Sequence, residues 1–531
     1  MFTFPSKPWA VLCLALGVSA SAEAAELTFD KQQIRTHIAT LASDEYGGRG
    51  PLTRGETLSI DYIAQEFAKL GLKPGNGDSY LQPVPLAQVT ADQGVTLKLG
   101  QLELTNGSEF TARTQRITPR IEVKDSPMVF VGYGINAPEY GWNDYAGLDV
   151  RGKTVVMLVN DPGFATQDPT LFKGNAMTYY GRWTYKYEEA ARQGAAAALI
   201  IHQTDAAGYA WGVVQNSNTG SKYTLVDASN NASELPVMGW LHQDAAHKLF
   251  KQSRLDLAAL SQAAAQPGFK PVTLTGTASI RFDNTARMAE SHNVLGLLPG
   301  SEMPEEVVMI HAHWDHLGTN KSDGHIYNGA IDNATGVAGV IELARVLSEQ
   351  HRQAPFKRSI LFSSFTAEET GLIGASHFAT HPTVPAGQIV AFLNIDGMNV
   401  DNALDYILRY GDGVSELEGY LERAARSQGR TVRPDPRPQA GLLYRSDHFA
   451  LAKVGVPGLL FMSLGDNDPD YIPHRYHKPA DDYHPDWSLE GMAQDLSLMA
   501  IIAAQLANNG DWPKWLEASE FRKRRALDGR Q

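Results

Sequence analysis

From residue 292 onward the sequence alternates between short apolar runs and amphipathic segments, and this alternation constrains the fold more than any other feature. Val307–His311 is apolar and β-branched, whereas Gly336–Leu347 has the spacing of an amphipathic helix. Three further runs suit buried strands, namely Ser359–Phe365, Ile389–Ile395 and Pro457–Phe461. Alternation of this kind predicts an α/β fold with a mostly parallel central sheet flanked by helices on both faces.

The segments before residue 292 have other patterns. Residues 27–75 show apolar side chains at helical spacing, whereas residues 127–285 contain short β-type runs and no concentration of His, Asp and Glu. We therefore predict one main domain that is interrupted by a β-rich accessory insert. The expected division is a signal peptide at 1–24, the first part of the main domain at 25–126, the insert at 127–285 and the main part at 286–531.

The N-terminus has the pattern of a cleaved secretory signal. Lys7 precedes the apolar run Trp9–Val18, and small residues follow it through Ala24. We expect a secreted or periplasmic protein whose mature form does not associate with membranes, because no other run reaches eighteen apolar residues. The net charge of −13 also argues against nucleic acid as a partner. The one cysteine, Cys13, lies in the signal, so only His, Asp and Glu could hold a metal.

Metal-binding side chains recur where the predicted strands end. The carboxyl ends of parallel strands meet at one edge of a sheet, which is where α/β folds place their sites. Two histidines and three carboxylates are enough for two zinc ions that share one carboxylate. A neighbouring glutamate that binds no metal would take a proton from water and deliver it to the leaving amine. The candidates are His313, Asp332, the doublet Glu368-Glu369, Asp396 and His477.

The run His-Ala-His-Trp-Asp-His at 311–316 has two interpretations. In the first, His311, His313, Asp315 and His316 form the H-x-H-x-D-H run of metallo-β-lactamase-type hydrolases. In the second, His313 binds metal and Asp315 orients it. The second interpretation is favoured, since the first leaves the downstream acids without roles and requires a β-sandwich.

The same residues resemble the co-catalytic dizinc aminopeptidase family, which includes bacterial leucine aminopeptidases and has glutamate carboxypeptidase II and glutaminyl cyclase as relatives. The resemblance is carried by His313-Trp-Asp315, Asp332-Asn333, Glu368-Glu369-Thr-Gly371, Asn394-Ile-Asp396 and Tyr476-His477. Within 127–285, the segments Gly152-Lys-Thr-Val-Val and Ala191-Arg-Gln-Gly-Ala-Ala look like a protease-associated domain.

The resemblance implies a role for each site residue. His313 and Asp396 would hold one zinc ion, Glu369 and His477 the other, and Asp332 would bridge the two. Glu368 would be the general base, with Asp315 fixing His313 and Tyr476 bonding the tetrahedral intermediate.

We therefore expect a secreted zinc exopeptidase that acts on peptides with a free N-terminus. Two alternatives stay open. One is a glutaminyl cyclase-like acyltransferase with a single zinc ion, and the other is the metallo-β-lactamase-type hydrolase.

Overall fold

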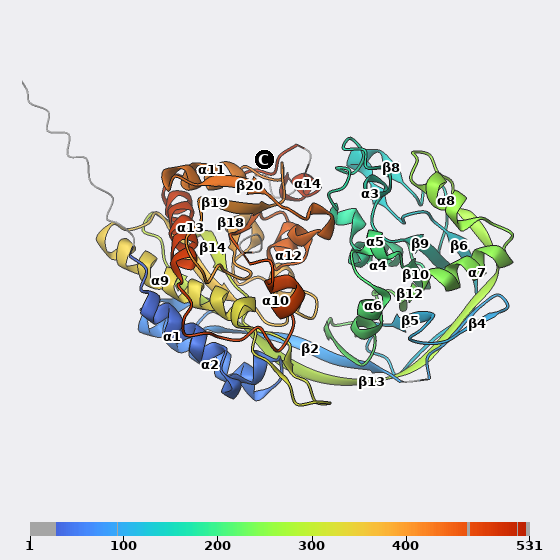
Figure 1. Ribbon diagram of the computed structural model, residues 1–531, viewed down its shortest axis with the longest axis horizontal. Coiled ribbons are helices and arrows are strands. Elements are labelled where there is room, and N and C mark those ends of the chain that lie inside the picture. Colours follow the sequence, from blue (N-terminus) through green and yellow to red (C-terminus); the bar gives the residue numbers. More distant parts are fainter. Residues whose placement is uncertain (1–27, 93, 465–467, 518, 527–531) are drawn as a thin grey trace, which may run out of the picture.

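The computed structural model describes residues 28–92, 94–464, 468–517 and 519–526. The signal peptide predicted at 1–24 lies outside the described residues. The described chain forms two lobes that stand side by side, with the long strands β2 and β13 running along the bottom of both (Figure 1). Among the described residues, no helix combines the length and the apolar character needed to cross a bilayer.

The first lobe is built on a large mixed sheet. Four neighbouring strands of this sheet are parallel, in the order β17-β14-β18-β21. Antiparallel strands flank them on both sides, because β13 pairs with β17 and β19 pairs with β21. The strands are β13 (Val272–Leu298), β14 (Met303–His311), β17 (Arg358–Ser364), β18 (Ile389–Asn394), β19 (Tyr406–Tyr410), β20 (Thr431–Pro434) and β21 (Gly458–Met462).

The register of the parallel strands brings their carboxyl ends to one edge. His311 at the end of β14 stands beside Ser363 of β17 and Asn394 of β18. The residues that follow these three strands therefore leave the sheet at neighbouring points. Three of the four predicted strands in this lobe are confirmed to within one residue at each end, and the fourth, β14, begins at Met303, four residues before the predicted start.

Helices cover both faces of this sheet, as alternate side chains of β14 show. Val308 and Ile310 belong to one apolar core, and Val307 and Met309 belong to another. The first core is closed by α1 (Lys31–Leu41), α2 (Arg54–Lys69), α9 (Gly336–Gln353), α11 (Leu417–Ser427) and α13 (Glu490–Asn508). The second is closed by α10 (Ile373–Thr380) and α12 (His448–Ala452). The α/β fold with helices on both faces is therefore confirmed.

The second lobe has a smaller sheet, in which the parallel strands β6, β9, β10 and β12 lie side by side. They are β6 (Arg120–Phe130), β9 (Thr154–Leu158), β10 (Ala197–Ile201) and β12 (Val237–Leu241), and among the helices around them are α4 (Trp183–Arg192), α6 (Trp211–Asn218), α7 (Gln243–Gln252) and α8 (Leu257–Ala264).

Residues before the predicted boundary at 127 also belong to this sheet. β3 (Thr96–Leu99) and β4 (Leu102–Leu104) form a hairpin on β13, and β5 (Phe110–Arg113) pairs with β12. β2 (Leu81–Ala91) pairs with β13 and with β11 (Ser221–Leu225). The division at 25–126, 127–285 and 286–531 stays a prediction.

Candidate metal centre

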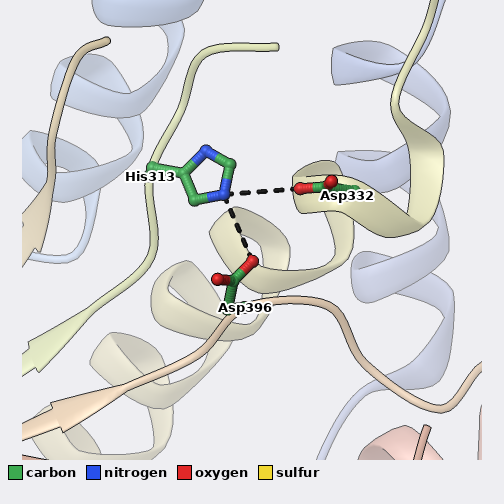
Figure 2. A group of neighbouring side chains, drawn as sticks. All are labelled: His313, Asp332 and Asp396. Atoms are coloured by element: carbon green, nitrogen blue, oxygen red, sulfur yellow. Dashed lines mark hydrogen bonds and ion pairs between the residues drawn. The ribbon is translucent and has the colours of Figure 1, made fainter. Parts of the chain in front are cut away.

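Three predicted ligands from different loops meet at the edge where the parallel strands end. His313 follows β14, Asp396 follows β18, and Asp332 lies in the loop before α9; all three point toward one another (Figure 2). Nε2 of His313 lies 3.3 Å from Oδ1 of Asp396 and 3.4 Å from Oδ1 of Asp332. Their potential ligand atoms all lie within 4.8 Å of one another, close enough to share one ion.

The other two predicted ligands lie on the far side of Asp332. Nε2 of His477 is 3.2 Å from Oδ2 of Asp332 and 3.0 Å from Oε2 of Glu369. The two oxygens of Asp332 thus face different histidines. This is the placement that a carboxylate shared by two ions requires.

The structure adds one histidine to this group. Nδ1 of His316 lies 2.6 Å from Oε1 of Glu369, and His316, Asp332 and Glu369 form a second set of potential ligands within 4.8 Å. Sequence reasoning gave His316 a role only in the lactamase alternative. Its place directly after Asp315 was the one available signal.

Glu368 lies beside the cluster, on the loop after β17, and is buried. Its Oε2 lies 3.9 Å from Nε2 of His313, which is too far for a hydrogen bond. Its backbone N–H donates to Oδ1 of Asp315 at 3.0 Å, and the same oxygen lies 3.7 Å from Nδ1 of His313. Asp315 therefore contacts both the predicted base and the predicted ligand, which fits a positioning role.

The electrostatics of the cluster are dominated by buried carboxylates. Burial raises the pKa of Glu368 well above its usual value, and the charges of Asp396 and Glu369 raise it further. Burial would lower the pKa of His477, but Glu369 and Asp332 outweigh it and raise that pKa to about 11. These acids outnumber the cationic groups around them, so the cluster favours an added cation.

The donor atoms are imidazole nitrogens and carboxylate oxygens that face a common space. This donor set suits zinc, and the placement of Asp332 between His313 and His477 suits two ions. The five predicted ligands therefore fit the group that the sequence implies.

Two buried side chains hold the Asp332 loop in place from distant parts of the chain. Asp481 accepts hydrogen bonds from the N–H groups of Ile331 and Asp332, both at 3.0 Å. Arg49 is fully buried and donates to the carbonyls of Leu41, Trp314, Asn328 and Gly329. Arg49 thus ties the loop after β14 to the loop that carries Asp332. Neither role was recognised from the sequence.

Asn333, next to the shared carboxylate, links two of the ligand loops. Its Nδ2 donates to the carbonyl of Ile395 at 3.0 Å, and its Oδ1 accepts from the N–H groups of Gly336 and Gly397 at 3.1 Å. Asn333 thereby fixes the loop of Asp332 against the loop of Asp396.

The structure disfavours the lactamase-type interpretation. His311 is fully buried, and its Nε2 lies 2.8 Å from Oδ2 of Asp447 while its Nδ1 lies 3.0 Å from Oγ of Ser363. In the described part of the chain, neither set of potential ligands includes His311. His311 packs beneath the site, since its partners lie on the sheet and on the segment before α12.

Tyr476, which the sequence analysis singled out, and Tyr444 have different surroundings. Tyr476 stacks on His477, with ring centroids 3.9 Å apart and an interplanar angle of 24°. The hydroxyl of Tyr444 donates to Oε1 of Glu520 at 2.7 Å, and its ring packs edge-on against Phe449. Tyr444 is therefore a packing residue, and Tyr476 lies beside a ligand.

Sequence comparisons agree with the placement of the site. Residues 293–501 match the model of Peptidase family M28. The chain is 27% identical over 197 residues to Aminopeptidase YwaD of Bacillus subtilis (strain 168), which covers 36% of this chain and 39% of the relative. It is 30% identical over 143 residues to Aminopeptidase NAALADL1 of Mus musculus, covering 26% and 18%. The matches span well under half the length of these relatives, and they confirm the family resemblance.

The fold also has a solved counterpart. An aminopeptidase from Aneurinibacillus sp. strain AM-1 superposes with a TM-score of 0.52 and 23% identity, covering 91% of this chain and 95% of that chain. The likeness extends over both lobes and supports the fold.

Proposed function

We propose that this chain, whose residues 293–501 match Peptidase family M28, is a secreted zinc aminopeptidase that removes N-terminal residues from peptides. The observation that carries the proposal is the placement of Asp332 between two histidines, with Asp396 and Glu369 on either side. The curated relatives named above are aminopeptidases, which supports the same reaction class.

His313, Asp396 and Asp332 would hold one zinc ion, and His477, Glu369 and Asp332 the other. Zinc in such a site supplies Lewis acidity toward a carbonyl oxygen and lowers the pKa of water. The excess of carboxylates over cationic groups among these residues supports two ions rather than one. Two ions also argue for hydrolysis over the single-zinc cyclase alternative.

Glu368 is the residue placed to move protons. Its carboxylate opens toward the space beside His313 and makes no hydrogen bond to the ligands, while its backbone is fixed by Asp315. It would accept a proton from the attacking water and pass it to the amine that leaves when the peptide bond breaks. Tyr476, stacked on His477, would donate its hydroxyl proton in a hydrogen bond to the tetrahedral intermediate.

Secretion and the nature of the second lobe belong to the same proposal. The pattern of residues 1–24 supports export, and the two short motifs within 127–285 support a protease-associated domain. Sequencing the N-terminus of the protein recovered outside the cytoplasm should give a start near residue 25. A mature protein that begins at Met1 would contradict export by this signal.

A panel of aminoacyl p-nitroanilides tests the proposed reaction. The purified protein should release nitroaniline, lose this activity after dialysis against a chelator, and regain it when zinc is added. A protein that holds zinc but cleaves no member of the panel and no free dipeptide would contradict the proposal. Activity that persists after complete removal of metal would do the same.

A further inference from the structure

Two arginines, Arg182 and Arg445, have no acidic partner among the residues that the structure describes. Nε of Arg182 is buried without a hydrogen-bond partner. In the described part of the chain, neither Arg182 nor Arg445 forms an ion pair with a carboxylate. Other buried guanidiniums of the described chain do pair with an acid; for example, Arg430 donates to Asp495 and Arg358 to Glu306. A guanidinium without an acidic partner has an uncompensated positive charge, which favours an anionic ligand.

The two arginines come from different lobes but lie on converging segments. Arg182 directly precedes α4 in the second lobe, and Arg445 follows the short turn Leu442–Tyr444 in the first. Oε1 of Glu520 accepts from the N–H of Tyr179 at 3.4 Å and from the hydroxyl of Tyr444 at 2.7 Å. One carboxylate oxygen therefore joins the two segments within a few residues of each arginine.

Packing between these segments reinforces the convergence. The ring of Tyr179 meets the ring of Phe449 edge-on, with centroids 5.2 Å apart. The N–H of Met177 donates to the carbonyl of Pro438 at 3.1 Å. A Cβ added at Gly441 would come within 2.8 Å of the sulfur of Met177, so the backbones approach closely.

A hydrogen bond ties the segment of Arg445 to the metal centre, because Nδ2 of Asn394, two residues before Asp396, donates to Oγ of Ser446 at 2.6 Å. Tyr476 raises the pKa of Arg445, and Glu368 and Asp396 also contribute to the rise. Burial lowers the pKa of Arg182 to about 10, and the positive charge of Arg445 lowers it further. Arg445 is exposed and Arg182 is partly exposed, so both guanidiniums can be reached from solvent.

We propose that Arg182 and Arg445 form an anion subsite that binds a carboxylate of the peptide substrate beside the metal centre. Two cations without an acid between them attract an anion, and planar guanidinium groups bind carboxylates through paired hydrogen bonds. The inference rests on the proposed function, because carboxylates are the anionic groups of an unmodified peptide. The carboxylate is either the C-terminus of a short peptide or an acidic side chain.

Matched substrate pairs separate these two sources. The first pair is Leu-Ala and Leu-Ala-amide, which differ in the C-terminal carboxylate. The second is the p-nitroanilides of Glu and Gln, which differ in the side chain. For one of the pairs, kcat/KM of the zinc-loaded enzyme should favour the acid by roughly 10–100-fold, mainly through KM, as expected for hydrogen bonds to charged groups.

Arginine variants connect the preference to the subsite. Arg182→Gln and Arg445→Gln should each remove most of the preference, and Arg445→Lys should restore part of it. Arg151→Gln is the matched control, because it removes an exposed guanidinium of the second lobe that pairs with Asp149. This control should leave the ratio unchanged. Because Arg445 is exposed, its variants are expected to fold even if Arg182→Gln does not.

Calorimetric binding separates this inference from the proposed reaction. The same four compounds are titrated into the zinc-loaded wild-type protein or, where turnover interferes, into its Glu368→Gln variant. If the wild-type protein cleaves no substrate but binds the acid of one pair more tightly than its uncharged counterpart, and the arginine variants lose this difference, the subsite is upheld and the proposed function is overturned. Equal binding and equal kcat/KM within both pairs would overturn the subsite, whether or not hydrolysis occurs. A preference that survives in the Arg182→Gln, Arg445→Gln double variant would overturn it too.

Discussion

Each lobe buries a cluster of charged side chains, and the two clusters differ in how their charges are balanced. The second-lobe cluster consists of Asp144, Asp161 and Lys186, and all three are almost completely buried. The site cluster consists of His313, Asp332, Glu368, Glu369, Asp396 and His477. The second-lobe cluster contains its own cation, and its two acids accept hydrogen bonds from the chain, whereas the site cluster has an excess of acids.

The second-lobe acids are satisfied by the chain itself. The oxygens of Asp161 accept from the N–H groups of Gly163, Phe164 and Thr178 and from the Thr178 hydroxyl. Asp144 accepts from the N–H of Ile135 and from Nε1 of Trp142. Asp161 and Asp144 raise the pKa of Lys186, against the dominant lowering by burial. The comparison teaches that buried acids alone do not indicate a metal site; unbalanced acids do.

The largest expected effect is on catalysis in the site cluster. Glu368→Gln should lower kcat by about 10²–10⁴-fold, because the amide cannot accept the proton of water. Steady-state kinetics and the zinc content of the same sample check this result. Glu349→Gln on the exposed side of α9 is the control and should keep full activity. Near-full turnover of zinc-loaded Glu368→Gln would refute the assigned base.

A substitution in the second-lobe cluster should lower the free energy of unfolding. Lys186→Met removes the cation and leaves two buried acids without a counter-charge. The free energy of unfolding should fall by about 3–5 kcal/mol, the range expected when a buried charge is left uncompensated. Chemical denaturation followed by fluorescence measures it. An unchanged unfolding midpoint would mean that Asp144 and Asp161 are balanced by their hydrogen bonds alone.

A substitution of Asp481 tests whether its hydrogen bonds to the Asp332 loop contribute to metal binding. Asp481→Asn leaves one of two backbone N–H groups in the Asp332 loop without an oxygen acceptor. Groups that support metal ligands typically contribute about 10–100-fold to metal affinity or activity, and a loss in this range is expected. Zinc titration after chelation measures the affinity. Asp482→Asn, on the neighbouring residue, is the control, and an affinity equal to wild type in Asp481→Asn would contradict the supporting role.

The smallest expected effect concerns His377, a buried histidine. Among the described residues it forms no ion pair with an acid, unlike the histidines of the site cluster. Burial, and to a smaller extent the neighbouring His381, lower the pKa of His377 to about 4. Between pH 6.5 and 4 the unfolded chain binds a proton there that the folded chain does not. The free energy of unfolding should therefore decrease as the pH is lowered from 6.5 to 4, by on the order of 1 kcal/mol after allowance for partial solvation.

His377→Asn should remove this part of the pH dependence, which thermal unfolding at pH 4.5 and 7 can detect. His325→Asn, on an exposed histidine, should leave it in place. If both variants lose stability with pH as the wild type does, His377 is not responsible.

The sequence predicted the site residues that belong to short local motifs. His313, Asp332, Glu368, Glu369, Asp396 and His477 each follow or precede a predicted element, so their convergence could be inferred from the order of strands and helices. Arg49, Asp447 and Asp481 could not be found this way. Their partners lie up to 280 residues away in the chain, and no local pattern reports such contacts.

The second lobe was harder to predict for a related reason. β3 and β5 lie before residue 127, yet they pair with strands that come more than a hundred residues later. Local alternation identifies a strand but not the sheet it joins. The contact between the segment before Arg182 and the first lobe depends on the same long-range docking.

Counting zinc in the purified protein tests the central claim most directly, namely that the site cluster is completed by metal and the second-lobe cluster is not. Elemental analysis should give two zinc ions per chain, fewer in Asp332→Asn, and an unchanged two in Asp144→Asn. Absence of zinc after loading, or the same zinc content in wild type and Asp332→Asn, would contradict the account.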